Sequence, residues 1–160
     1  MKKSLNIDYQ IFSDISQLDE TDRRLLEMAR SALDKAYAPY SGFQVAAALM
    51  LDNGIQIVGT NQENASYGLC LCAEQNILAT AGSEHFHSAV KVMAITARSL
   101  NKPVDHPISP CGACRQVLSE HEDRHQQPIR LLLQGETGEI LCFASAKDLL
   151  PFSFSAKDLL

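Results

Sequence analysis

The order of the apolar segments restricts this chain to a layered fold of helices and strands. Two strand-type runs, "FQVAAALML" at 43–51 and "IQIVGTN" at 55–61, flank Asp-Asn-Gly at 52–54, a sequence typical of the turn in a two-stranded hairpin. Before them, apolar residues recur at helical spacing from about residue 19 to residue 36, and Pro39 follows. The core is therefore expected to begin with a helix that leads into a hairpin.

The second half of the chain continues this alternation. "CAEQNILATAG" at 72–82 predicts a helix that ends at its final glycine, and "VKVMAITA" at 90–97 predicts a buried strand. A polar, proline-containing loop leads to a further helix at 111–122, and "IRLLLQ" and "EILCF" predict strands at 129–134 and 139–143. This order, without an internal linker, predicts one layered α/β domain with a mixed sheet.

The two ends of the chain differ from this central part. Residues 1–18 form a polar lead-in with little periodicity, which leaves 19–160 as the predicted domain. Near the C-terminus the hexapeptide "SAKDLL" occurs at 145–150 and again at 155–160. Each copy predicts a short helical turn capped by its serine.

The first residues and the cysteine content indicate a cytoplasmic protein. "MKKSLNIDYQIFSD" has two lysines but no apolar run behind them, so we expect neither a signal peptide nor a membrane span. The five cysteines are an odd number, and clustered cysteines in a reduced compartment are typical of metal binding or catalysis rather than of disulfides.

The balance of charge argues against nucleic acid as the partner. The chain has 14 basic and 19 acidic residues, a net charge of −5, and no stretch that gathers lysine and arginine. Binding to a phosphate backbone requires concentrated positive charge. Small substrates or protein partners are therefore expected.

A CxxC pair is the first candidate for chemistry. Cys111 and Cys114 stand at the start of a predicted helix, with the spacing of two ligands of one tetrahedral zinc ion. A structural zinc finger completed by His121 and His125 is excluded, because an unbroken helix would separate Cys114 from His121 by about 10 Å. A thioredoxin-like redox pair stays open on this segment alone, although such a pair usually follows a strand directly.

The upstream segment "GLCLCAEQN" changes this interpretation. Either Cys70 or Cys72 can complete a three-cysteine set with the CxxC pair, and spacing alone leaves both eligible. Glu74 would then lie beside the open ligand position, as a carboxylate does in catalytic zinc sites. Taken singly, Cys72 is typical of a small buried residue and Glu74 of a charge in the first turn of a helix. The combination favours catalysis.

Five motifs in order resemble the zinc-dependent nucleoside deaminases, and the cytidine deaminase family in particular. They are "YAPYSGFQVAAAL", "NQENASYG", "CAE", "PCGACRQVLSE" and "LLPFSF", and they span roughly residues 36–154. The resemblance implies a single three-layer α/β/α domain with a mixed sheet of roughly five strands. It also implies that Cys72, Cys111 and Cys114 bind one zinc ion per chain and that Glu74 is the general acid and base.

The same resemblance implies a nucleoside pocket that is shared between subunits of a homotetramer. Asn61 and Glu63 would hydrogen-bond the ribose, and Phe43 would line the pyrimidine pocket. Without the resemblance, Asn61 and Glu63 would be ordinary turn residues at a strand end, and Phe43 an ordinary core residue. A neighbouring subunit would complete the site, and the residues concerned are Ala65, Tyr67 and Phe154.

The reaction that this resemblance implies is hydrolytic deamination of cytidine or deoxycytidine to the uridine product and ammonia, a step of pyrimidine salvage. A second enzymatic hypothesis keeps zinc but replaces the substrate by a polynucleotide cytosine or an aminonucleoside antibiotic. The acidic balance disfavours the first, and "NQENA", which suits a free ribose, disfavours both. A third hypothesis is a binding domain in which zinc is purely structural.

Gln75 departs from the pattern that the chain resembles. Relatives with three cysteine ligands commonly have arginine directly after the glutamate. Three thiolates around one Zn²⁺ carry a net charge of −1, which an arginine would offset. Gln75 can donate hydrogen bonds to a ligand sulfur but brings no charge. We therefore expect the helix dipoles, or Arg115, to compensate.

Overall fold

A six-stranded sheet forms the middle layer of the computed structural model, which describes residues 1–159. The strand order is β1-β6-β5-β4-β2-β3, and β4 and β5 are the parallel pair in an otherwise antiparallel arrangement. The sheet is therefore mixed, as predicted. The strands are β1 Tyr9–Phe12, β2 Phe43–Leu51, β3 Gln56–Thr60, β4 Val90–Ser99, β5 Arg130–Gln134 and β6 Ile140–Phe143.

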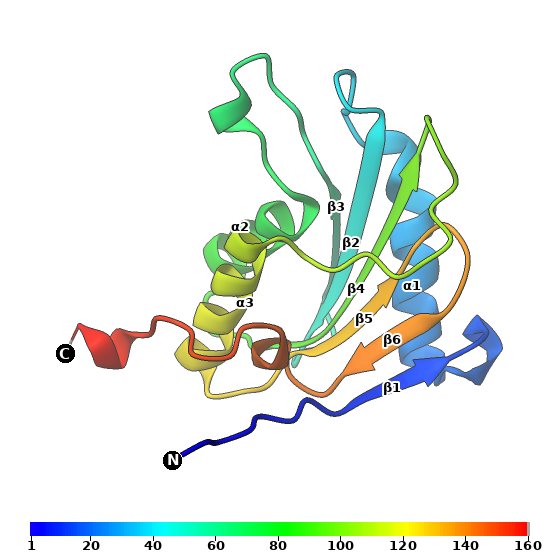
Figure 1. Cartoon of the computed structure of the whole chain (residues 1–160). Coiled ribbons are helices and arrows are strands. Elements are labelled where there is room, and N and C mark those ends of the chain that lie inside the picture. The colour runs from blue at the N-terminus through cyan, green and yellow to red at the C-terminus, as the bar shows by residue number, and fades with distance from the viewer. Residues whose placement is uncertain (160) are drawn as a thin grey trace.

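Three α-helices cover the two faces of the sheet, which gives the predicted three-layer α/β/α arrangement (Figure 1). Helix α1 (Glu20–Ala32) lies on one face, and α2 (Ala73–Glu84) and α3 (Gly112–His125) lie on the other. Parallel strands need a crossover connection, and α3 supplies it between β4 and β5. Among residues 1–159 no helix has the length and apolar character needed to cross a membrane.

Alternation along β2 explains how one strand serves both layers. Ala46 and Ala48 face α1 and pack with its buried residues, such as Leu25 and Ala29. Ala47 and Leu49 face the opposite side, because successive side chains of a strand point to opposite faces. The small alanines let α1 lie close to the sheet, so the helix predicted over residues 19–36 is fixed by burial of its apolar stripe.

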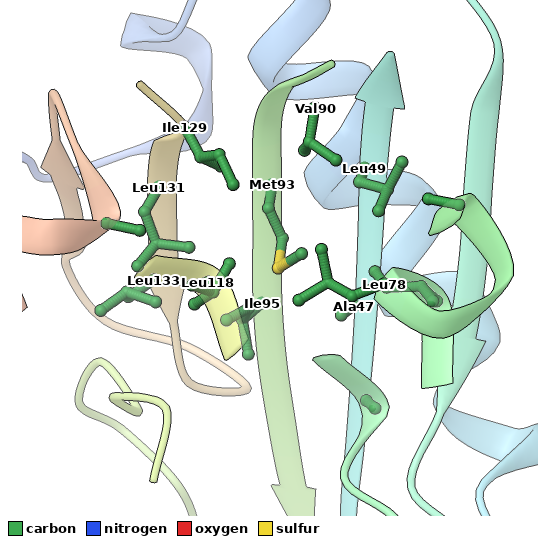
Figure 2. Close-up of a cluster of buried hydrophobic side chains, with 14 of the residues drawn as sticks. Ala47, Leu49, Leu78, Val90, Met93, Ile95, Leu118, Ile129, Leu131 and Leu133 are labelled. Carbon is green, nitrogen blue, oxygen red and sulfur yellow. The ribbon is translucent and has the colours of Figure 1, made fainter. Parts of the chain in front are cut away.

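The second core lies between the sheet and the helices α2 and α3. Leu78 of α2 and Leu118 of α3 are fully buried against Met93 and Ile95 of the central strand β4 (Figure 2). Leu131 of β5 joins the same cluster. This core holds the N-termini of α2 and α3 at fixed positions over one end of the sheet.

Two details differ from the sequence-based expectation. The sheet has six strands rather than five, because residues 9–12 of the expected lead-in form β1, which pairs antiparallel with β6. This strand is short, lies at an edge and is mostly exposed, so its side chains do not alternate between buried and exposed. Helix α2 also continues past Gly82 to Glu84, and a Cβ at Gly82 would lie 3.4 Å from Nη1 of Arg124 on α3.

Both copies of the hexapeptide form the predicted short turns, although their surroundings differ. The turns are 3₁₀ helices over Ala146–Leu149 and Ala156–Asp158, with Ser145 and Ser155 as their N-caps. Ala146 is fully buried, whereas Ala156 is exposed. The last residue of the second copy lies outside the described residues.

Glu122 ties α3 to two other parts of the fold. Its carboxylate is almost completely buried and accepts hydrogen bonds from the backbone N–H of Ile129 at 2.9 Å and of Ala146 at 2.7 Å. The hydroxyl of Ser145 donates to the same group at 2.7 Å. One side chain thus fixes the end of α3 relative to β5 and to the turn after β6.

Glu122→Ala should lower the free energy of unfolding by about 2–5 kcal/mol, because two buried N–H groups lose their acceptor. Glu120→Ala, at an exposed position on the same helix, should change it by less than about 0.5 kcal/mol. Chemical denaturation at one protein concentration measures both. Equal stability of the two variants would contradict the structural role of Glu122.

Candidate active site

Three cysteines converge where the N-termini of α2 and α3 meet. Cys72 is the N-cap residue of α2 and Cys111 is the N-cap residue of α3, while Cys114 lies in the first turn of α3 and is buried. The Sγ atoms of Cys72 and Cys111 are 3.9 Å apart, and those of Cys111 and Cys114 are 3.5 Å apart. All three sulfurs lie within 4.8 Å of one another.

These distances fit one tetrahedral zinc ion. Zinc–sulfur bonds of about 2.3 Å in tetrahedral geometry place neighbouring sulfurs about 3.8 Å apart. The observed separations of 3.5 and 3.9 Å are close to this value without any movement of the helices. Three cysteine thiolates are also a donor set that zinc prefers. The cluster therefore has the composition and spacing of a site for one zinc ion.

The proximity of the three thiols affects their pKa values in a way that favours a bound cation. A hydrogen bond from Cys114 lowers the pKa of Cys72 to about 7, against the effect of burial. The pKa of Cys114 is raised, mainly by its contact with Cys72 and by desolvation. One thiolate therefore forms readily while a second is opposed by the first. A bound dication removes this opposition, and the positive ends of two helix dipoles act in the same direction.

Glu74 lies beside this cluster in the first turn of α2. Its side chain is 4% exposed, and burial raises its pKa. Glu74, Cys72 and Cys111 line a common pocket of about 400 Å³. Burial thus favours the protonated form of this carboxyl group, and a carboxyl group at such a position can both accept and return a proton.

The wall of the pocket comes from the ends of β2 and β3. Phe43, Asn61 and Glu63 line it together with Glu74, so these predicted residues share one cavity. The Asn61 side chain accepts from the Val45 N–H at 2.8 Å and donates to the Phe43 carbonyl at 2.9 Å. It thereby fixes the start of β2, including Phe43.

The carboxylate of Glu63 contacts the turn before β2. It accepts hydrogen bonds from the backbone N–H of Tyr40 at 2.8 Å and of Ser41 at 3.3 Å, and from the hydroxyl of Ser41. These bonds lower the pKa of Glu63, with the Ser41 hydroxyl contributing most. Ser41 itself lines the pocket. Within the motif "YAPYSGF" only Phe43 was predicted to line the pocket, because a serine in a turn has no spacing that marks a site.

The three residues expected to serve a neighbouring subunit do not line this pocket, although Tyr67 lines a smaller adjoining cavity with Ser41, Glu63 and Cys70. Tyr67 is 74% exposed and Phe154 is 58% exposed, and neither they nor Ala65 line the cavity beside Glu74. Ala65 and Tyr67 belong to the segment between β3 and α2, which projects from the body of the molecule (Figure 1). Phe154 follows the turn that packs on α3, and its carbonyl accepts a hydrogen bond from Gln116 at 2.9 Å.

Cys70 lies in the pocket wall rather than in the metal cluster. Its sulfur accepts a hydrogen bond from the Asn64 N–H at 3.3 Å, and it is not among the sulfurs that lie close together. Of the two cysteines that spacing left eligible, the structure therefore brings Cys72 to the CxxC pair. Within residues 1–159, neither His121 nor His125 joins a metal-ligating cluster, so the finger hypothesis is excluded by geometry as well.

Gln75 and Arg115 are placed differently relative to the cysteine cluster. Gln75 lines a separate groove between α2 and α3, and the hydrogen bonds found among residues 1–159 include none from its amide to a cysteine sulfur. The Arg115 guanidinium donates to the carbonyls of Pro110 at 2.8 Å and Leu149 at 3.0 Å. Because the guanidinium keeps its charge one residue from Cys114, compensation by Arg115 or by the dipoles of α2 and α3 stays a prediction.

The fold and the site together define a zinc-dependent hydrolytic deaminase, since three cysteine ligands beside a buried, non-ligating glutamate are the arrangement of that class. A family model described as the cytidine and deoxycytidylate deaminase zinc-binding region matches residues 19–126. The chain belongs to the cytidine and deoxycytidylate deaminase family.

Individual relatives agree with this assignment. The chain is 43% identical over 141 residues to a protein of Halalkalibacterium halodurans named cytidine deaminase, a match that covers 86% of this chain and 98% of that one. It is 36% identical over 134 residues to a cytidine deaminase of Mycobacterium tuberculosis, covering 82% and 87%. The crystal structure of a cytidine deaminase from Burkholderia pseudomallei superimposes with a TM-score of 0.70 at 40% identity, covering 82% of this chain and 97% of that chain.

Cys72→Ala should abolish stoichiometric zinc binding, because two remaining thiols do not complete the site. Cys70→Ala is the matched control two residues away and should retain about one zinc per chain. Metal analysis of the dialysed proteins measures both. If Cys70→Ala loses the metal and Cys72→Ala keeps it, the assignment of the third ligand is wrong.

Proposed function

We propose that this chain catalyses the hydrolytic deamination of cytidine or deoxycytidine to uridine or deoxyuridine and ammonia, a step of pyrimidine salvage. The observation that carries the proposal is the buried Glu74 beside three clustered cysteines, in the same pocket as Phe43, Asn61 and Glu63. Membership of the cytidine and deoxycytidylate deaminase family and the names of the relatives support the same reaction.

Cys72, Cys111 and Cys114 are proposed to hold one zinc ion per chain. When bound, zinc supplies Lewis acidity that makes water a usable nucleophile near neutral pH. The protein contributes the fixed orientation of the three sulfurs, which two helices packed on one core keep within 4.8 Å of one another.

Glu74 is proposed to move the protons of the reaction. It accepts a proton from the attacking water and delivers one to N3 of the ring, so that the C4 carbon gains oxygen while the aromatic ring is interrupted. Glu74 then transfers the proton of the C4 hydroxyl to the amino group, so that ammonia leaves as the C4 carbonyl of the uridine product forms. Burial raises the pKa of Glu74, which suits a group that has to be both base and acid.

Asn61, Glu63 and Phe43 are proposed to hold the nucleoside. Asn61 uses one amide hydrogen and one oxygen lone pair on the backbone of β2, and so keeps one donor and one acceptor free for the ribose. The pKa of Glu63 is lowered by its hydrogen bonds, so its carboxylate is ionised at neutral pH and accepts a sugar hydroxyl. Phe43 offers an apolar surface to the pyrimidine.

The alternative hypotheses have weaker support. A polynucleotide substrate would need a basic surface, whereas the net charge is −5. An aminonucleoside antibiotic would present a modified sugar to Asn61 and Glu63, which suit a free ribose. A purely structural zinc site would not require a buried carboxyl group beside the ligands, since burial of Glu74 without a function costs free energy.

The wider organisation is also proposed. We infer that residues 19–160 form the catalytic domain together with the edge strand β1 from the expected lead-in, and that the chain forms a homotetramer in which Ala65, Tyr67 and Phe154 complete a neighbouring site. The exposure of Tyr67 and Phe154 supports this assembly. The five free thiols support a reducing, cytoplasmic location.

Glu74→Ala should lower kcat for cytidine by at least about 10²–10⁴-fold while about one zinc per chain is retained, because a proton carrier is lost and no ligand is removed. Glu84→Ala, at the exposed end of the same helix, should keep full activity. The loss of cytidine absorbance in the ultraviolet measures turnover. Full activity of Glu74→Ala with bound zinc would contradict the proposed reaction.

Mixing two inactive variants should restore activity if sites are shared. Tyr67→Ala keeps its own Glu74, and Glu74→Ala supplies an intact Tyr67. Random reassembly from equal amounts should therefore recover up to about a quarter of the parental activity. Phe86→Ala, an exposed aromatic outside the pocket, should be fully active alone. Absence of recovery in mixed oligomers verified by mass spectrometry would place each site within one chain.

A further inference from the structure

The Ser41 hydroxyl links the turn that precedes β2 to two residues of the pocket wall. The Ser41 hydroxyl donates to the carboxylate of Glu63 and accepts a hydrogen bond from the Phe43 N–H at 2.9 Å. Ser41, Phe43 and Glu63 all line the pocket that contains Glu74. One side chain thus connects the carboxylate proposed to bind the sugar with the residue proposed to face the base.

The hydrogen-bonding capacity of Glu63 gives this connection its significance. An ionised carboxylate accepts about four hydrogen bonds. Three come from the turn, namely two from the Tyr40 and Ser41 N–H groups and one from the Ser41 hydroxyl. About one acceptor position therefore remains for a ligand, and its direction is set by the three bonds already made.

The turn does not depend on the Ser41 hydroxyl for its own conformation. The Gly42 N–H donates to the Ala38 carbonyl at 3.0 Å, and Gly42 has a positive φ of 64°. On the other side, the Asn101 side chain donates to the Ser41 carbonyl at 2.9 Å, and the Leu100 N–H donates to the Gly42 carbonyl at 2.9 Å. Removal of the hydroxyl should therefore leave the turn in place while the Glu63 carboxylate and the Phe43 N–H lose their shared partner.

We propose that Ser41 is a positioning residue, which fixes the Glu63 carboxylate for the nucleoside and couples it to Phe43. This inference rests on the proposed function, because it assigns Glu63 to the sugar. Ser41 is exposed, so its substitution should affect the stability of the fold less than substitution of a core residue. It also takes no part in the proton transfers assigned to Glu74. Its loss should therefore weaken binding of the nucleoside and leave the chemical step almost unchanged.

Steady-state kinetics with cytidine provide the first test. Ser41→Ala should raise KM about tenfold, which corresponds to one charge-assisted hydrogen bond, and should change kcat by less than about twofold. Ser41→Thr retains the hydroxyl and should restore KM to within about threefold of the parent. Ser31→Ala is the matched control, because Ser31 is an exposed serine whose hydroxyl bonds only the Glu27 carbonyl on α1.

A double substitution tests whether Ser41 acts through Glu63. In a Glu63→Ala background, Ser41→Ala should change KM by less than about twofold, since the group that it orients is already absent. A tenfold effect in that background would mean that Ser41 acts on KM without Glu63, through Phe43 or by direct contact with the nucleoside, and would overturn its role in positioning Glu63. An unchanged KM in the single variant, or a loss confined to kcat, would also overturn it.

Calorimetric titration with uridine separates this inference from the proposed reaction, because the product binds without turnover. If the parent protein binds uridine, and Ser41→Ala weakens binding about tenfold, the positioning role holds even where no deamination is measured. If the parent deaminates cytidine, and neither KM nor the uridine Kd responds to Ser41→Ala, the reaction stands and the inference fails. A parent protein that neither deaminates cytidine nor binds uridine would overturn both.

Discussion

The rest of this structure depends on one constraint, which is that the N-termini of α2 and α3 lie next to each other. Three cysteine sulfurs within 4.8 Å of one another form a site suited to a cation. This spacing requires that the helices carrying Cys72 and Cys111 keep a fixed separation, and their shared core provides it. The fold meets this need by placing α2 and α3 on the same face of one sheet, packed on a shared core. The parallel pair β4 and β5 follows from it, because α3 is the crossover between them. Glu74 is buried in the first turn of α2, so the helix that begins at Cys72 also places a carboxyl group beside the cluster.

On the side of the pocket formed by the ends of β2 and β3, polar side chains hydrogen-bond to the backbone rather than to one another. Asn61 fixes the first residues of β2, and Glu63 gathers the N–H groups of the preceding turn. Both side chains keep part of their hydrogen-bonding capacity free, so the same groups can stabilise the wall and contact a ligand. The hydrogen bonds of Asn61 and Glu63 to the backbone therefore keep this wall of the pocket in place within a single chain, although the wall consists of segments at the ends of strands.

Local sequence was sufficient for the layers of the fold and for two of the three cysteines of the metal cluster. The Asp-Asn-Gly turn between two apolar runs predicted β2 and β3, and the cysteine spacing within α3 predicted two ligands. Spacing could not separate Cys70 from Cys72, because that choice depends on where the chain turns into α2; the structure makes Cys72 the N-cap and leaves Cys70 in the wall. The strand β1 was missed because an exposed edge strand gains its pairing from β6, which lies far along the sequence. Arg115 could not be placed from sequence either, because its partners include Leu149 near the C-terminus.

The C-terminal segment shows how identical sequence can serve different purposes. Both hexapeptides cap a short turn with serine, so local sequence determines their conformation. Only the first copy meets the buried carboxylate of Glu122, which accepts from Ser145 and Ala146 and so anchors the segment to α3. Beyond this anchor, Arg115 and Gln116 bind the carbonyls of Leu149 and Phe154, and the Phe154 side chain is left exposed. These bonds hold the backbone of the segment against α3 and leave the Phe154 ring free for the contact with a neighbouring subunit proposed above. The metal-binding helix α3 is thus also the support for the tail, so any change at Cys111–Cys114 that shifts α3 would also shift Phe154.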